Sequence, residues 1–224
     1  MELHGIDVSS WQGKIDWSAV RGNADFAMIR MGCGSKNGID LDRRFYENVA
    51  GALGAGIPAG AYVYSYAKTA AQAEAEALGC LAVLENLKKT FLFPIAFDME
   101  QYRLGRELMT DICAAFLSRI EEAGWYAAIY SSTAFFRDEL DDSRLARYDH
   151  WVAQWHPRCT YPGEYGIWQN GCSGKIPGIG TDTDTDVAYK NYPAVIVSSS
   201  LNGFTAGDVD GDGELTAQDA RRAL

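Results

Sequence analysis

The chain has 224 residues, and its 20 basic and 30 acidic side chains give a formal net charge of −10 at pH 7. This excess of acid argues against nucleic acids and anionic membranes as partners. No stretch approaches the ~20 consecutive apolar residues of a membrane span. Met1-Glu2-Leu3-His4 leads directly into a predicted strand rather than a signal peptide. We therefore expect a globular protein that is either cytoplasmic or a mature secreted form without its leader.

Eight short apolar segments are predicted to be strands. They are Gly5–Ser9, Phe26–Met31, Gly60–Tyr66, Leu92–Met99, Tyr126–Ser131, Trp151–Trp155, Tyr165–Gln169 and Thr183–Ala188. Helical patterns separate the early strands. Their signals are an N-cap at Asp42 before Phe45, Val49 and Leu53, a capping box of Thr69 and Gln72, and a helix from Thr110 to Gly124. Alternating strands and helices predict right-handed crossovers and a parallel sheet.

The last three predicted strands have no helices between them. The links before the seventh and eighth strands are short and rich in Gly, Pro, Ser and Thr, so they are interpreted as hairpin-type. We therefore predict an α/β fold, a TIM-like barrel of five βα units plus three further strands, over residues 1–196. A short strand is predicted over Ala194–Val197, a linker over 197–205, and a separate unit over 206–224.

Five cysteines are an odd number, so at least one is free within a single chain. Cys80 and Cys113 lie in helix-like apolar segments, where a small buried hydrophobe is expected. Cys159 and Cys172 are the pair considered for a disulfide. They follow successive strands, however, and a hairpin would place them at opposite ends, beyond the reach of a disulfide.

The stretch Phe91–Glu100 is predicted to be a buried strand that ends in two carboxylates. Asp98 and Glu100 are two residues apart, so they point to one side, with Cα atoms roughly 6.6 Å apart. Two carboxylates at the C-terminal end of a buried strand indicate acid/base chemistry. The alternative is a salt-bridged strand end.

Further aspartates lie on the first and last predicted strands. Asp7 is on the first strand, close to the aromatic Trp11. Asp182, Asp184 and Asp186 alternate along the eighth strand and so share one face. Either one of them lies inside the barrel mouth with the others at the strand edges, or the three bind a metal, although no His or Cys joins them.

Residues 208–219 have the spacing of a calcium-binding loop. Asp208, Asp210 and Asp212 would be the ligands at positions one, three and five, with Gly213 at the sharp bend; Glu214, Thr216 and Asp219 would serve positions seven, nine and twelve. Asp219 would also open a short helix. The prediction is therefore a Ca²⁺ site in a short EF-hand-like loop and helix, the alternative being an acidic solvated tail.

Several motifs together resemble one enzyme family. They are Gly5-Ile6-Asp7-Val8-Ser9-x-Trp11-Gln12-Gly13, Gly60-Ala61-Tyr62-x-Tyr64-Ser65-Tyr66-Ala67, Asp98-x-Glu100, Tyr130-Ser131-Ser132, Trp151-Val152-Ala153-Gln154, Gly166-Ile167-Trp168-Gln169 and Asp184-x-Asp186. In this order they resemble the glycoside hydrolase family 25 lysozymes (N-acetylmuramidases). The tail, with Asp rather than Glu at position twelve, resembles the first repeat of a dockerin. That resemblance implies a cohesin partner for a complete dockerin, of which residues 206–224 would be one part.

The family resemblance implies a secreted or cell-surface enzyme that cleaves the β-1,4 bond between N-acetylmuramic acid and N-acetylglucosamine in peptidoglycan, without a catalytic cofactor. It implies that Glu100 is the general acid, that Asp98 is its partner, and that Asp7 and Asp184 are further active-site aspartates. Asp98 would act as a nucleophile or orient the substrate's 2-acetamido group, and we favour the second, which retains configuration. The alternatives are a chitinase-like hydrolase and an inactive peptidoglycan-binding module.

Aromatic residues on or near strand ends are candidate sugar contacts. They are Tyr62, Tyr64, Tyr130, Trp155, Trp168 and Trp11. For each of these side chains, packing in the core is the alternative role. Cys33 and Trp155 depart from the tyrosines that the family usually has at these places, which would alter sugar contacts rather than the chemistry.

Overall fold

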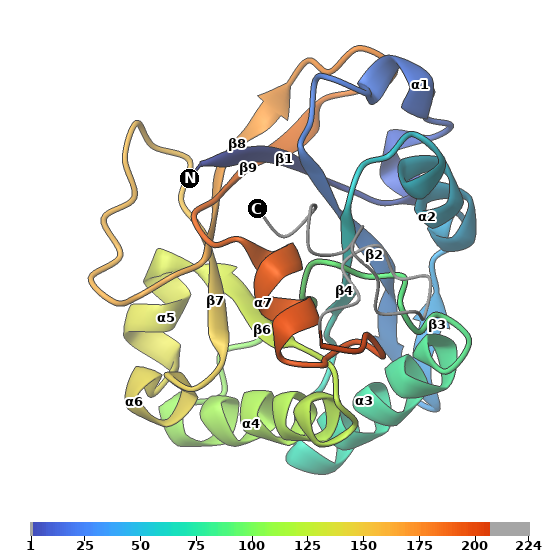
Figure 1. Cartoon of the computed structure of the whole chain (residues 1–224). Helices are drawn as coiled ribbons and strands as arrows, with labels where there is room; N and C mark the ends of the chain where they lie inside the picture. Colours follow the sequence, from blue (N-terminus) through green and yellow to red (C-terminus); the bar gives the residue numbers. More distant parts are fainter. Residues whose placement is uncertain (1, 207–224) are drawn as a thin grey trace.

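The computed structural model describes residues 2–206, which form a closed barrel with helices around it (Figure 1). The strands are β1 (Leu3–Val8), β2 (Phe26–Ser35), β3 (Gly38–Leu41), β4 (Ala59–Tyr64), β5 (Ile95–Asp98), β6 (Ala127–Ser132), β7 (Asp149–Ala153), β8 (Ile167–Gly174) and β9 (Thr183–Ala188). Their order is β1-β9-β8-β7-β6-β5-β4-β2-β3, and pairing of β1 with β2 closes the barrel. The predicted TIM-like barrel of eight strands is confirmed, and β3 is an additional strand that pairs with β2 outside the closed ring.

The alternation of side chains along the strands divides the apolar residues into two layers. On β5, Ile95 and Phe97 point outward and pack in the layer shared with the helices, whereas Ala96 points inward. Phe26, Trp151 and other inward residues fill the barrel itself. Both faces of the strands are therefore buried, and the end of β5 opens toward the space left at the C-terminal mouth of the barrel.

The helical elements are η1 (Ser10–Gln12), α1 (Trp17–Val20), α2 (Phe45–Gly54), α3 (Ala70–Leu84), α4 (Arg106–Glu122), α5 (Thr133–Glu139), α6 (Asp142–Leu145) and α7 (Tyr192–Ser198). Helices follow β1, β2, β4, β5 and β6, as the five predicted βα units require. Gly56 and Gly124 follow α2 and α4 at φ values of 75° and 81°, where glycine has no steric penalty.

Two details of the helix predictions are wrong. Asp42 does not cap α2, because its carboxylate accepts hydrogen bonds from the Ser10 and Arg44 N–H groups and pairs with Arg30. Leu53 is 40% exposed, and Ala52 takes its place on the buried face. An i, i+4, i+8 series drifts around a helix of 3.6 residues per turn, so its third member leaves the face.

The starts of α3 and α4 also differ from the prediction. Thr69 accepts a hydrogen bond from the Gln72 N–H, as in a capping box, but the Gln72 side chain accepts from Lys68 instead of returning to Thr69. Helix α4 begins at Arg106, and Thr110 lies inside it, donating its hydroxyl proton to the Arg106 carbonyl. A threonine hydroxyl that bonds to a carbonyl one turn earlier lies inside a helix rather than at its N-cap. The predicted start of the helix at Thr110 is therefore wrong.

The link between β7 and β8 is not a hairpin, because the two strands are parallel, with Trp151 opposite Ile167. Residues 154–166 carry the chain back to the start of the barrel as an irregular loop. A strand the length of β7 spans only about 16 Å, so an extended loop can make this return without a helix. The hairpin prediction is confirmed for β8 and β9, which pair antiparallel.

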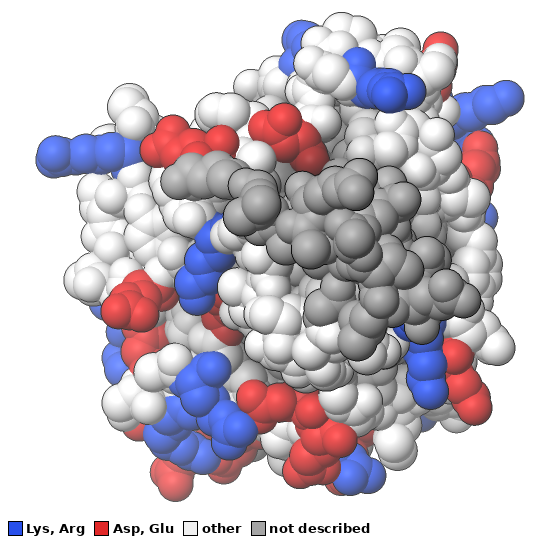
Figure 2. All heavy atoms as spheres, viewed as in Figure 1, with Lys and Arg blue, Asp and Glu red and all other residues white. Residues whose placement is uncertain are grey.

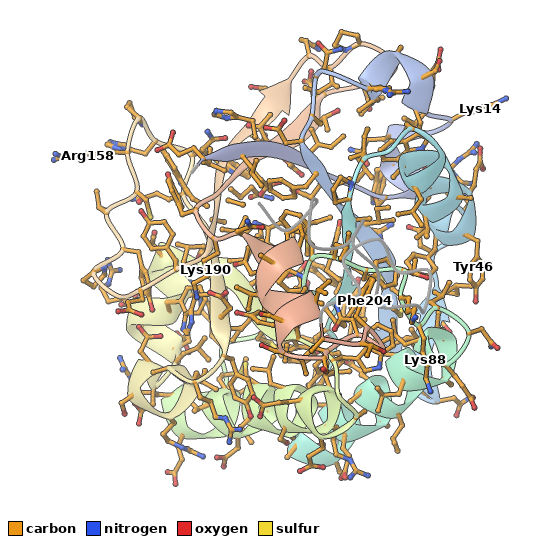
Figure 3. The ribbon with its side chains drawn as sticks, viewed as in Figure 1. Lys14, Tyr46, Lys88, Arg158, Lys190 and Phe204 are labelled. Atoms are coloured by element: carbon orange, nitrogen blue, oxygen red, sulfur yellow. The ribbon has the colours of Figure 1, made fainter. Side chains whose placement is uncertain are left out.

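The opposite end of the barrel is closed by α7 and the residues after it (Figure 1). The strand predicted over Ala194–Val197 is wrong, because these residues lie within α7, where Asn191 caps the helix and Pro193 occupies its first turn. Ile196, Val197 and Phe204 pack on the barrel interior. Lys190 and Phe204 lie on either side of α7 in Figure 3.

Residues 197–205, predicted to be a linker, lie against the barrel. Asn202 is fully buried. Its side chain accepts a hydrogen bond from the Tyr126 N–H at 2.7 Å and donates one to the Phe91 carbonyl at 2.8 Å. The Asn202 backbone adds bonds to Gly124 and Lys89. The division of the chain into a barrel domain and a C-terminal unit stays a prediction, since residues 207–224 lie outside the described part.

Charges of both signs are interspersed around the edge of the face that α7 closes (Figure 2). Within residues 2–206, no helix combines the length and the apolar character needed to cross a membrane.

Candidate active site

A cleft of about 260 Å³ opens at the C-terminal end of the barrel strands. Its lining residues are Asp7, Ser9, Trp11, Gln12, Arg30, Tyr62, Tyr64, Asp98, Glu100, Tyr130, Trp151, Gln169 and Asp184. The structure thus brings together the four carboxylates that the sequence singled out, although they come from the first, middle and last strands. This position is where barrel enzymes hold their catalytic groups.

Three hydrogen bonds hold the segment that carries the central pair of carboxylates. The Asp98 carbonyl accepts from the Ser65 N–H at 2.9 Å, and the Met99 N–H donates to the Tyr130 carbonyl at 3.1 Å. The Ser131 hydroxyl donates to the Met99 carbonyl at 2.6 Å. The chain is therefore fixed by the strands on both sides, with the Asp98 side chain buried and Glu100 at the exposed end of the segment.

Crowding of carboxylates raises their pKa values, because burial and like charges both disfavour the ionised form. Burial, followed by the charges of Glu100 and Asp7, raises the pKa of Asp98 well above its usual range, and Arg30 opposes this. Burial and then Asp184 raise the pKa of Glu100. Burial also raises the pKa of Asp184. The cluster thus holds protons at a pH where isolated carboxyl groups would be ionised.

A fifth carboxyl group, Asp186, lies beneath this cluster. It is 1% exposed, and its Oδ1 accepts from the Trp151 indole N–H at 2.7 Å. Its side chain also shares a hydrogen bond with Asp7, and two carboxyl groups can share one only through a proton. Burial, followed by the charge of Asp184, raises the pKa of Asp7 to about 8, and the hydrogen bonds with Gln169 and Asp186 oppose this rise.

Asp184 and Asp186 both face the barrel interior, whereas Asp182 is exposed and pairs with Lys175. Of the three, Asp184 lines the cleft, whereas Asp186 is buried beneath it rather than at a strand edge. Among the described residues, no group of three or more His, Cys, Asp or Glu side chains has the arrangement of a metal site. Strand alternation signalled Asp186, but its place below Asp7 depends on how β1 pairs with β9.

Arg30 is the basic residue in the cleft lining, and sequence reasoning did not select it. Its guanidinium donates to Asp42 Oδ2 from Nε at 3.0 Å and from Nη2 at 2.7 Å. The same Asp42 oxygen accepts from the Ser10 N–H at 3.0 Å, at the start of the turn that carries Trp11. The pair therefore joins β2 to the turn at the rim of the cleft.

Gln169 belongs to the motif Gly166-Ile167-Trp168-Gln169, but its sequence context does not indicate a role for it. Its side chain is buried and bonds to Asp7, Tyr130 and Trp155. The signal that could have selected it is a polar residue in an otherwise apolar strand, since a buried amide must find partners.

The six candidate aromatic residues occupy different places. Trp11, Tyr62, Tyr64 and Tyr130 line the cleft, and Trp11 is 78% exposed at its rim. Trp155 is 63% exposed and reaches the site through Gln169. Trp168 is buried outside the cleft lining, and its indole N–H donates to the Gln154 carbonyl at 2.8 Å.

The remaining sequence predictions concern cysteines and calcium. All five cysteines are free thiols, so Cys159 and Cys172 are not bonded to each other. The predicted calcium ligands Asp208, Asp210, Asp212, Glu214, Thr216 and Asp219 lie outside the described residues.

A family model for glycosyl hydrolases family 25 matches residues 6–179, and the chain belongs to this family. The uncharacterized protein YegX of Escherichia coli O157:H7 is 29% identical over 197 residues, which cover 83% of this chain and 69% of YegX. Lysozyme M1 of Streptomyces globisporus is 27% identical over 198 residues, 81% of this chain and 66% of that protein. The family match ends before the tail, and these relatives give no support for a dockerin-like repeat or a cohesin partner.

Solved structures show the same fold. The autolysin LytC of Streptococcus pneumoniae, crystallised with a synthetic peptidoglycan ligand, has a TM-score of 0.75 at 22% identity. That match covers 84% of this chain and 47% of LytC, so the chain spans about half the length of LytC. A bacterial lysozyme from Streptomyces coelicolor has a TM-score of 0.68 at 22% identity, over 92% of this chain and 97% of that one. At these identities the similarity shows the barrel fold.

Proposed function

We propose that the chain is a muramidase that hydrolyses the β-1,4 bond between N-acetylmuramic acid and N-acetylglucosamine in peptidoglycan. The observation that carries the proposal is the pair Asp98 and Glu100 at the end of β5, facing a cleft with Asp7 and Asp184. Membership of family 25 and the similarity to lysozyme M1 support it. Because peptidoglycan lies outside the cell membrane, we also propose that the enzyme is secreted or on the cell surface.

Glu100 is proposed to be the general acid. Its raised pKa keeps a proton on a carboxyl group that remains accessible at the cleft. That proton would pass to the oxygen of the leaving sugar as the glycosidic bond breaks, and the resulting carboxylate would then accept a proton from the attacking water. Glu100 therefore serves as acid and base in turn.

Asp98 is proposed to orient the substrate's 2-acetamido group. Its Oδ1 is buried and accepts no hydrogen bond from the described residues. An acetamido N–H would satisfy this oxygen and favour the carboxylate form, which places the acetamido oxygen for attack on the anomeric carbon. The acetamido group then leaves as water attacks, with net retention. Direct attack by Asp98 is the competing route.

Sugar rings are proposed to lie against the aromatic side chains of the cleft. Trp11 offers an exposed face at the rim, and Tyr62, Tyr64 and Tyr130 lie deeper. Aromatic faces suit the apolar faces of sugar rings, whereas the carboxylates and Arg30 suit their polar substituents. The glycan strand of peptidoglycan is the partner that this lining fits.

Release of reducing sugars from purified cell walls tests the proposal. Wild-type chain should clear a wall suspension and produce fragments with muramic acid at the reducing end, and Glu100→Gln should lower the rate by at least about 100-fold. Glu85→Gln, an exposed carboxylate on the far end of α3, is the matched control. Binding to cell walls without release of reducing sugars would identify an inactive binding module. Fragments with glucosamine at the reducing end would identify a glucosaminidase. Release of sugars from chitin alone would identify a chitinase-like enzyme.

We also propose, from the spacing of residues 208–219, that the tail binds Ca²⁺ as a single EF-hand-like loop. Calorimetric titration of the full chain should show a Ca²⁺ site that Asp208→Ala and Asp219→Ala remove. Equal heats for all three proteins would refute the loop.

A further inference from the structure

One buried amide, that of Gln169, joins the exposed Trp155 to Asp7 in the cleft. Its Nε2 donates to Asp7 Oδ2 at 2.8 Å. Its Oε1 accepts from the Tyr130 hydroxyl at 3.0 Å and from the Trp155 indole N–H at 3.1 Å. The residue is 3% exposed, whereas Trp155 is 63% exposed, so the amide connects a solvent-facing ring to the interior.

The orientation of this amide is fixed by chemistry. An indole N–H can only donate, so the group that faces Trp155 must be the carbonyl oxygen of Gln169. The amide N–H₂ must then face Asp7, which accepts. With two donors on the same oxygen, the loss of one contact leaves the other to hold the orientation.

Strand pairing places the amide where it can act on Asp7. Gln169 lies opposite Asp186 in the β8–β9 pair, and Asp184 lies opposite Asp7 in the β9–β1 pair. Strand β9 lies between β8 and β1, so the Gln169 amide reaches Asp7 across β9, from the same side as the carboxyl groups of Asp184 and Asp186. Without the amide, Asp7 would face only carboxyl groups on this side of the barrel.

We propose that Gln169 is a positioning residue that holds Asp7 in one orientation and links it to Tyr130 and to the exposed Trp155. This role deepens the muramidase proposal and rests on it for its kinetic consequences. The bond from Gln169 fixes the Oδ2 atom of Asp7, a residue that lines the cleft. Gln169 itself acts through Asp7 and needs no contact with the substrate.

Two substitutions of Gln169 separate its contacts. Gln169→Met keeps the shape and removes every hydrogen bond, whereas Gln169→Glu keeps acceptor oxygens for Trp155 and Tyr130 but loses the donor to Asp7 when ionised. Asn170→Leu is the matched control, because this neighbouring amide accepts from Thr185 and lies outside the cleft lining. Circular dichroism verifies that each variant is folded.

Kinetics on soluble glycan fragments provide the first measurement. Gln169→Met should lower kcat by about 10- to 100-fold, the size of a lost hydrogen bond to a charged group, with KM within about threefold of wild type. Gln169→Glu should be equally slow at high pH and recover at low pH, where its protonated carboxyl group can donate to Asp7. Equal kcat in Gln169→Met, Asn170→Leu and wild type, or a pH-independent loss in Gln169→Glu, would overturn the proposal.

A carbon-13 titration of the Asp7 carboxyl group, assigned with Asp7→Asn, gives a measurement that needs no activity. The groups that face Asp7 are Asp184 and Asp186 on β9, Asp98 at the end of β5, Glu100 just after it, Tyr62 on β4, Tyr130 on β6 and Arg30 on β2. Removing the Gln169 donor should raise the Asp7 pKa from its value of about 8. An unchanged midpoint in Gln169→Met would overturn the positioning role. Wild-type chain without hydrolase activity would refute the proposed function alone, and the titration would still decide the role of Gln169.

Discussion

Replacing Arg30 by methionine should destabilise the fold and alter the active site together. The Arg30 and Asp42 side chains are 15% and 1% exposed, and two nitrogen atoms of the guanidinium donate to one carboxylate oxygen. Burial would raise the pKa of Asp42, but the Arg44 and Ser10 N–H groups and Arg30 outweigh burial and lower it. The variant leaves this carboxylate buried with only its two backbone donors.

The expected cost follows from this geometry. Removing one partner of a buried ion pair costs ~3–5 kcal/mol. Because Arg30 is partly exposed and Asp42 keeps two N–H donors, we expect about 2–3 kcal/mol for Arg30→Met at pH 7. The lowered pKa of Asp42 means that the stabilisation is present above its unfolded value of ~3.9 and is lost as the pH falls through the folded value. The difference between variant and wild type should therefore shrink below about pH 4.

Urea unfolding at pH 7 and pH 3.5 measures this difference. Arg44→Met is the matched control, since its pair with Glu47 has side chains 27% and 49% exposed and is worth about 0–1 kcal/mol. Arg30 also opposes the rise in the pKa of Asp98, so kcat should fall in Arg30→Met and not in Arg44→Met. If both variants unfold at the same urea concentration, the pair does not hold the rim turn as argued.

Three further changes test other parts of the structure. Asp7→Asn should abolish activity yet stabilise the chain at pH 8. The Asp7 pKa of about 8 means that the folded state binds this proton more tightly than the unfolded state does. In urea unfolding, the stability of the wild type should therefore fall from pH 5 to pH 8, and that of the variant should fall less. Asn202→Ala should lower the free energy of unfolding by about 2–4 kcal/mol in the same assay, because the backbone groups of Tyr126, Phe91 and Phe93 lose their hydrogen-bond partner. A decrease below about 0.5 kcal/mol would mean that residues 197–205 are only a linker. Trp11→Ala should raise KM by about 3- to 10-fold with an unchanged melting temperature, and an unchanged KM would remove Trp11 from the sugar contacts.

The sequence was sufficient to predict the mouth of the barrel because short-range rules determine it. A two-residue period places Asp98 and Glu100 on one side, and the end of a buried parallel strand places them at the mouth. Periodicity alone did not assign Asp7 and Asp184 to the same cleft; the resemblance to family 25 did. Asp184 lies near the start of β9, which runs antiparallel to β1, so the rule for the ends of parallel strands does not reach it.

Residues whose role depends on strand pairing could not be assigned in this way. Both faces of a barrel strand are buried, so the alternation on β8 does not say whether Trp168 or Gln169 faces the interior. The structure places Gln169 inward, where it meets Asp7, and Trp168 outward against Gln154. Arg30 was missed for a related reason, because its partner Asp42 was assigned to a helix cap.

The closed end of the barrel was misjudged because its polarity resembles that of a linker. Ser198, Ser199, Ser200 and Asn202 suggest solvated chain, yet the barrel leaves backbone groups at this end that need partners. Asn202 supplies them: it takes a φ of 54°, which asparagine tolerates, and bonds to Phe91, Phe93 and Tyr126. A polar residue inside a serine-rich segment therefore caps the bottom of the barrel.

The carboxylate cluster shows why the two ends of the barrel differ in what they contribute. Asp7, Asp98 and Asp186 are at most 5% exposed and the pKa of each is raised, so their burial opposes folding at neutral pH. The layers below them are apolar, and the end closed by α7 has its buried Asn202 side chain fully bonded. The stabilising contacts thus lie away from the cleft, and they offset the unfavourable burial of carboxyl groups at the mouth of the barrel. For this reason we expect substitutions that neutralise the cluster to stabilise the fold and substitutions at the closed end to destabilise it.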